Sequence, residues 1–94
     1  PHPLPSWNTY DQLKNDLRPY LKTWFVALEK LKLTQRDNVF CVLCFIYPQM
    51  PIDDLASSMC ITKDAFFVRK TQVTKKLGIT SSQFTDFLLK LSNS

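Results

Sequence analysis

A single glycine, Gly78, is present in the whole chain of 94 residues. Hairpins and β-sandwiches need residues with a positive φ angle in their tight turns, and glycine adopts that angle most readily. Helices have no such requirement. The length corresponds to one domain, and a hydrophobic content of 45% is typical of a globular chain with a buried core. The sequence therefore predicts an all-α fold rather than an all-β fold.

Three threonines mark the starts of helices, because each is followed three residues later by a side chain that can complete a capping box or a close variant of one. The pairs are Thr9 with Gln12, Thr34 with Asp37, and Thr80 with Gln83. Apolar residues at steps of three and four follow the first pair, and Pro19 interrupts them. Proline either kinks a helix or begins one. We therefore expect one helix over 9–18 and another over 19–32.

The most apolar segment of the chain, residues 35–47, predicts the central helix, because it is hydrophobic on nearly every side. Pro48 ends this helix, and Pro51 starts a further helix near 52–59. The last helix is expected over 81–91, where apolar residues again recur on one face.

The segment 61–79 does not read as one regular helix. A continuous helix would place Lys70 within an apolar stripe, so we expect a break near 69–71, with helices over 63–68 and 71–77. A strand near 66–73 is the competing prediction, since phenylalanine, valine and threonine favour strands. Gly78 ends the preceding helix in either case.

The stretch 75–91, KKLGITSSQFTDFLLKL, has the form of a helix-turn-helix. A fainter copy precedes it: Ile61-Thr62 matches Ile79-Thr80, with apolar residues at equivalent positions on either side. Two helix-turn-helix units in series would give this similarity, and so would chance. The overall expectation is a compact bundle of five or six helices over 9–94 with a C-terminal helix-turn-helix-like unit, preceded by an extended proline-rich arm over 1–8.

The cysteines are expected to be reduced core residues. Cys41 and Cys44 lie inside the apolar segment rather than at a helix start, where a redox pair would stand. A zinc site needs about four ligands, and only Cys60 and His2 could complete this one. We predict no metal and no cofactor. An odd, low cysteine count favours a reducing compartment, either the nucleus or the cytoplasm.

The sequence offers little for catalysis. Its one histidine is His2, and it has no glycine-rich phosphate loop and no nucleophile motif. Asp53 and Asp54 are adjacent, so on a helix they point about 100° apart and cannot converge on a substrate. We expect a protein that is not an enzyme and has no small-molecule substrate. No apolar run reaches the roughly 18 residues of a membrane span, so no membrane partner is expected.

The whole net charge of +4 belongs to residues 61–94, because basic and acidic groups balance over residues 1–60. A basic region around a helix-turn-helix favours nucleic-acid binding. The candidate contacts are Lys63, Arg69, Lys70, Lys75, Lys76, Ser81, Ser82, Gln83, Thr85 and Lys90. However, the last helix has no arginine to read guanine, and Asp86 would face phosphates. Weak binding of DNA or RNA is therefore the alternative function.

The favoured function is a protein-interaction or assembly module of an intracellular protein, with the nucleus preferred. Aromatic residues exceed what one small core needs, and surplus rings are typical interface anchors. Internal packing of the same rings is the competing interpretation. The candidates are Tyr20, Trp24 and Phe25, with Phe25 expected on the polar side of its helix. The partner would be another protein or a second copy of the chain.

Overall fold

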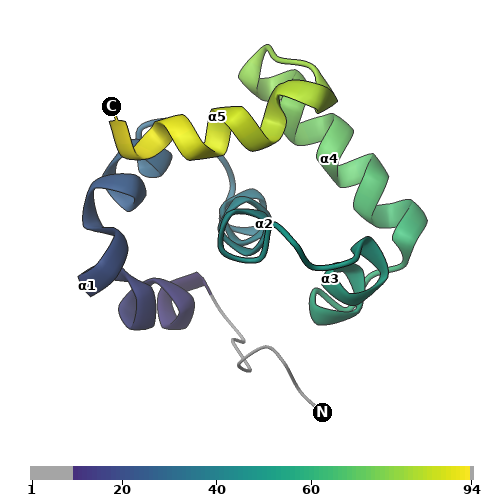
Figure 1. Cartoon of the computed structure of the whole chain (residues 1–94), viewed down its shortest axis with the longest axis horizontal. Helices are drawn as coiled ribbons and strands as arrows, with labels where there is room; N and C mark the ends of the chain where they lie inside the picture. The colour runs from purple at the N-terminus through teal and green to yellow at the C-terminus, as the bar shows by residue number, and fades with distance from the viewer. Residues whose placement is uncertain (1–9, 94) are drawn as a thin grey trace.

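The computed structural model describes residues 10–93, and every regular element in this range is helical. The all-α prediction is confirmed. The expected arm over 1–8 and the cap at Thr9 lie outside the described residues. The elements are α1 (Tyr10–Glu29), α2 (Gln35–Ile46), α3 (Ile52–Ser58), α4 (Lys63–Leu77), the 3₁₀ turn η1 (Ser81–Gln83), α5 (Phe84–Lys90) and the 3₁₀ turn η2 (Leu91–Asn93). Figure 1 shows the other helices arranged around α2.

Helix α1 is two helical segments joined at a bend. Leu21 has non-helical angles, with φ at −131° and ψ at 35°. Two residues earlier, Pro19 has no N–H and cannot donate to the carbonyl of Asn15, so the helical hydrogen bonding is already weakened there. The predicted break near Pro19 is confirmed, displaced by two residues toward the C-terminus.

The bend brings the two ends of α1 together. The Tyr10 hydroxyl donates to Oε2 of Glu29 at 3.0 Å, and Lys14 forms an ion pair with the same carboxylate. A straight helix would separate residues 10 and 29 by about 28 Å. The first and last residues of α1 can therefore meet only because the chain turns sharply at Leu21 (Figure 1).

Helix α2 is the central element, as predicted. Its residues Phe40, Cys41 and Val42 have no solvent exposure. The Phe40 ring lies 4.9 Å from the ring of Phe66 in α4 and 5.9 Å from that of Phe84 in α5, measured between centroids. One side chain of α2 thus contacts aromatic rings from two other helices.

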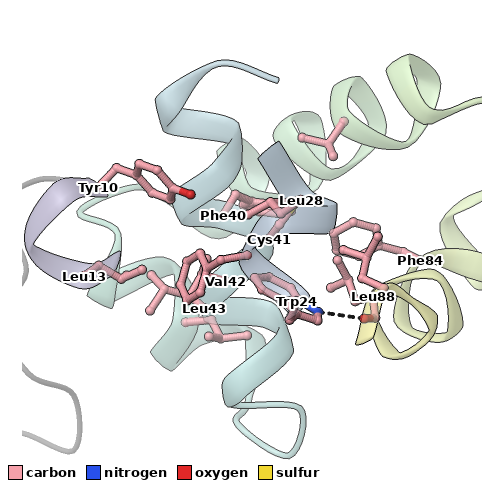
Figure 2. Close-up of a cluster of buried hydrophobic side chains, with 14 of the residues drawn as sticks. Tyr10, Leu13, Trp24, Leu28, Phe40, Cys41, Val42, Leu43, Phe84 and Leu88 are labelled. Atoms are coloured by element: carbon pink, nitrogen blue, oxygen red, sulfur yellow. Dashed lines mark hydrogen bonds between the residues drawn. The ribbon is translucent and has the colours of Figure 1, made fainter. Parts of the chain in front are cut away.

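A buried hydrogen bond fastens the C-terminal helix to α1. The indole Nε1 of Trp24 donates to the carbonyl oxygen of Leu88 at 2.8 Å, as Figure 2 shows. The same indole stacks on the ring of Phe45 in α2, with centroids 4.5 Å apart. A buried indole N–H needs an acceptor, and this one finds it 64 residues further along the chain.

Three helix junctions share one backbone form. At each, a residue with positive φ follows a helix, and an aliphatic residue and a threonine come next. The three tripeptides are Lys32-Leu33-Thr34, Cys60-Ile61-Thr62 and Gly78-Ile79-Thr80, whose first residues have φ angles of 59°, 59° and 71°. Left-handed residues of this kind commonly end helices. The predicted stop at Gly78 is confirmed.

The second and third junctions also share their hydrogen bonds. The Ile61 N–H donates to the carbonyl of Ala56 at 3.0 Å, and the Ile79 N–H donates to the equivalent carbonyl of Thr74 at 3.0 Å. The similarity between the two stretches of sequence is therefore also a similarity of structure. The described part of the chain thus has two similar helix junctions in series, between α3 and α4 and between α4 and α5.

The threonines then begin the next helices. Thr34 Oγ1 accepts from the Asp37 N–H, and Thr62 Oγ1 accepts from the Ala65 N–H, each at 3.1 Å. At Thr80 the backbone N–H donates to Oε1 of Gln83 at 2.9 Å, as expected of a capping box.

Helix α4 is continuous, so the predicted break near 69–71 is wrong, and the described part of the chain has no strand at 66–73. The break was expected because Lys70 interrupts an apolar stripe. In the structure Lys70 is half-buried, and its Nζ lies 5.9 Å from the centroid of the Phe84 ring. A cation over an aromatic ring is a favourable arrangement, so a half-buried lysine is compatible with a continuous helix here.

Candidate functional site

Two of the three aromatic candidates for protein contact are core residues. Trp24 and Phe25 are each 1% exposed, so the prediction that Phe25 lies on the polar side of α1 is wrong. Phe25 is three or four residues from both a charged pair, Lys22 and Glu29, and an apolar pair, Leu21 and Leu28. Sequence spacing alone therefore places Phe25 between the two faces. The Trp24 ring meets it edge-on at 5.5 Å, and the core encloses it.

The third candidate, Tyr20, is 82% exposed and lies beside the bend in α1. A shallow hollow in the same region is lined by Asn15, Arg18, Pro19 and Lys22. Isolated exposed apolar side chains are normal on a protein surface. Tyr20 therefore remains a predicted contact, but it does not form part of a pair of large exposed apolar side chains.

Two large apolar residues on α4, Phe67 and Val68, are 43% and 57% exposed, and as consecutive residues they lie about 100° apart around the helix axis. The Phe67 ring meets the buried Phe66 ring edge-on, at 5.9 Å between centroids and 88° between planes. Phe67 thus contacts a core ring while it remains 43% exposed. The other exposed large apolar residues among those described are Tyr20 and Val26 on α1 and Leu89 on α5.

Phe67 and Val68 belong to a regular outward face of α4. The face is defined by exposed residues at helical spacing: Asp64, Phe67, Val68, Thr71, Gln72 and Lys75. Sequence reasoning missed this face because a break was expected within it, and two short helices give no common face. The sequence signal that could have revealed the face is the recurrence of these residues at steps of three and four.

The structure uses several of the predicted nucleic-acid contacts internally. Lys76 Nζ lies 2.6 Å from Oδ2 of Asp37, a carboxylate whose side chain is only 8% exposed. Lys70 lies over the Phe84 ring. Lys63 is 3.9 Å from Oδ1 of Asp53, and both groups are exposed. The basic residues of α4 are therefore not one free positive surface.

Two other basic residues on α4 form no ion pair within residues 10–93. Lys75 is exposed and Arg69 is half-buried. These two side chains keep their charge available at the surface of the helix. Lys90 is also exposed, at the end of α5.

The polar residues expected to read bases serve the start of the last helix. Ser81, Ser82 and Gln83 form a 3₁₀ turn, in which the Gln83 side chain accepts from Thr80 and Ser82 Oγ lies 3.0 Å from Thr80 Oγ1. Thr85 is exposed in the first turn of α5, together with Asp86. The amide oxygen of Gln83 is therefore committed to capping.

The cysteines differ in exposure. Cys41 is fully buried, as predicted, whereas Cys44 is half-buried and Cys60 is exposed. Burial raises the pKa of the Cys41 thiol above its ordinary value, and it raises the pKa of Cys44 to about 12. Cys41 and Cys44 are therefore protonated at neutral pH. Over residues 10–93, histidine, cysteine and carboxylate side chains form no cluster of three or more that could hold a metal ion.

No protein-family model matches the chain, and neither a curated protein nor a solved structure matches it. Within the described part of the chain, no helix is both long enough and apolar enough to span a bilayer. Function must therefore be argued from the surface chemistry of the fold itself.

Proposed function

We propose that the chain is a protein-interaction module that binds its partner through the outward face of α4. The observation that carries this proposal is the exposure of two large apolar residues, Phe67 and Val68, on this face. Burying apolar surface stabilises a complex by about 25 cal/mol per Å² before the losses of association are counted. Exposed apolar surface and aromatic side chains are characteristic of contact sites.

The build of α4 supports this function. The helix is 15 residues long, Thr62 caps its start, and Gly78 ends it in the left-handed conformation. Its inner face is anchored by Phe66 and Val73, which are almost completely buried. A helix that is already formed and anchored loses little conformational freedom when a partner binds to its outer face.

A non-catalytic role in the nucleus or cytoplasm is part of the proposal. Cys41, Cys44 and Cys60 are all free thiols, which suits a reducing compartment. Asp53 and Asp54 are exposed in the first turn of α3, where negative charge interacts favourably with the helix dipole and stabilises the helix. This structural role accounts for the two carboxylates without a catalytic function.

Nucleic-acid binding remains the second candidate because α4 carries five basic residues and a single acidic one. Against it, Lys70 and Lys76 are engaged within the fold, and Asp64 and Asp86 lie in the first turns of the helices that would approach DNA. Carboxylates at those positions would face phosphates. The charge distribution therefore favours a protein partner.

The test compares two double variants, each of which replaces two exposed apolar residues with glutamine. Phe67→Gln with Val68→Gln removes the apolar part of the α4 face, whereas Val26→Gln with Leu89→Gln removes exposed apolar residues elsewhere. Proximity labelling in cells, followed by binding measurements with the purified partner, should show at least a tenfold loss of affinity for the α4 variant and none for the control. A partner that binds both variants equally would contradict the proposal.

A further inference from the structure

The outward face of α4 changes in character along the helix. Asp64 lies in its first turn, Phe67 and Val68 follow, and Lys75 lies in the last turn. Lys75 is seven residues beyond Val68, which is two turns along the same side of the helix, or about 10 Å. The face therefore offers an acidic group, an apolar pair and a cation in that order.

Lys75 and its neighbour Lys76 differ in their ion pairing. Lys76 is paired with Asp37 at 2.6 Å, but Lys75 is exposed and makes no ion pair within the described range. The positive charge of Lys75 is stabilising in the last turn of α4, at the negative end of the helix dipole. Lys75 nevertheless keeps a solvent-facing charge on the side of α4 that carries Val68, so a partner that covers Val68 lies within reach of this charge.

We infer that the segment covering this face is an amphipathic helix, antiparallel to α4, with acidic side chains in its first turns; this inference rests on the proposed function. Negative side chains are most favourable near a helix N-terminus, and an antiparallel partner places that end beside Lys75 and the C-terminus of α4. Apolar residues of the partner about seven positions later then reach Phe67 and Val68.

The N-terminal end of the α4 face predicts a third feature of the partner helix. Asp64 is four residues before Val68, so it lies one turn beyond the apolar pair in the direction of the partner's C-terminus. A cation is favoured at that end of the partner helix, both by its dipole and by Asp64. The partner helix therefore has acidic, apolar and basic residues in that order.

A nucleic acid does not fit this arrangement as well. A phosphate backbone would satisfy Lys75, but it would leave Phe67 and Val68 without an apolar partner and would face Asp64. The ordered sequence of charges along one helix face is complementary to a second helix.

The test is a selection from displayed peptides of about five helical turns, roughly 18 residues at 3.6 residues per turn. The library fixes an apolar pair in the middle and randomises the flanking positions, and the target is the whole chain. We expect enriched peptides to carry Asp or Glu about seven residues before the apolar pair and Lys or Arg about four residues after it. Binding should weaken as the salt concentration rises.

Charge reversal then locates the contact. Lys75→Glu should weaken the selected peptides about tenfold, and replacing their acidic residues with lysine should restore binding to this variant. Lys22→Glu, at an exposed cation on α1, is the matched control and should change affinity less than twofold. Loss of both effects at high salt would support a charge contact rather than a change in fold.

The possible failures are distinguishable. Peptides that require Phe67 and Val68 but show no acidic preference, or carry it at the opposite end, would overturn this inference and leave the proposed function standing. If no selected peptide depends on these two residues, the α4 face itself is not the binding site and the proposed function fails. Displacement of the peptides by a short DNA duplex at physiological salt would assign the face to nucleic acid and overturn both.

Discussion

Phe25 and Phe67 are chemically identical residues in opposite environments. The Phe25 ring is enclosed by Trp24 and Tyr10, with centroids 5.5 Å and 6.3 Å away, whereas Phe67 is 43% exposed. Replacing Phe25 with alanine should lower the free energy of unfolding by about 3–5 kcal/mol, since it removes a buried ring and leaves a cavity. Replacing Phe67 with alanine should lower it by about 1 kcal/mol or less.

Urea denaturation of both variants checks this prediction. A large loss for Phe67→Ala would mean that its ring contributes to the core, which would weaken the proposed binding face. The expected order also shows what sequence spacing lacks for a single residue. Phe25 is equally compatible with its charged and its apolar neighbours on α1, and only packing against Trp24 settles which side it takes.

Among the elements, the helix junctions allow a direct test of backbone strain. Gly78 and Cys60 occupy equivalent places, with φ angles of 71° and 59°. A β-carbon added at Gly78 would meet no atom within 4 Å, so Gly78→Ala should cost only the backbone term of about 1–2 kcal/mol. Cys60→Gly should stabilise the fold by a smaller amount, about 0.5–1 kcal/mol, because glycine also loses more freedom on folding.

Thermal melts of these two variants should therefore shift in opposite directions. A shift of about 4–8 °C per kcal/mol is expected for a domain of this size. If Cys60→Gly lowers the melting temperature, the cysteine side chain contributes contacts that outweigh the strain of its left-handed backbone.

The bend in α1 predicts a pH dependence. A hydrogen bond from Lys14 holds the pKa of Glu29 below its ordinary value of 4.5, and the Tyr10 hydroxyl acts in the same direction. A lowered folded-state pKa adds stability that is fully present above the unfolded pKa and is lost as the pH falls through the folded value. Glu29→Gln should therefore lower the melting temperature at pH 7, and the difference from the parent chain should shrink below about pH 4.

Melting temperatures of the two chains at pH 7 and pH 3 provide the measurement. A difference that stays constant over this range would show that the carboxylate charge does not hold the bend, and that the substituted amide side chain simply packs less well. Asp11→Asn, in the exposed first turn of the same helix, controls for a general effect of removing negative charge.

Local signals in the sequence predicted most of the elements, and tertiary contacts explain the exceptions. Pro19, Thr34, Thr80 and Gly78 act through their own backbone or the next turn, so their effects are visible in the sequence. The half-buried position of Lys70 within α4 involves instead a contact with the Phe84 ring, whose centroid lies 5.9 Å from Lys70 Nζ. That contact is between two helices, so the local sequence pattern of α4 does not predict it.

For the whole molecule, long-range contacts decide which charges remain at the surface. The sequence locates the net charge of +4 in residues 61–94, and this predicted a basic surface. The fold pairs Lys76 with Asp37, which is 39 residues away, and places Lys70 over an aromatic ring. Composition predicts the amount of charge correctly, but its availability depends on how α2 and α5 pack against α4.

Lys75 and Lys76 form a matched pair for testing this division of roles. Lys76→Ala leaves the Asp37 carboxylate, 8% exposed, without its partner and should lower the free energy of unfolding by about 1–3 kcal/mol. Lys75→Ala removes an exposed cation and should change it by less than about 0.5 kcal/mol. Adding Asp37→Asn to Lys76→Ala should recover part of the loss, since it removes the unpaired charge. Equal effects of the two lysine substitutions in urea denaturation would contradict the pairing and would return Lys76 to the candidates for surface binding.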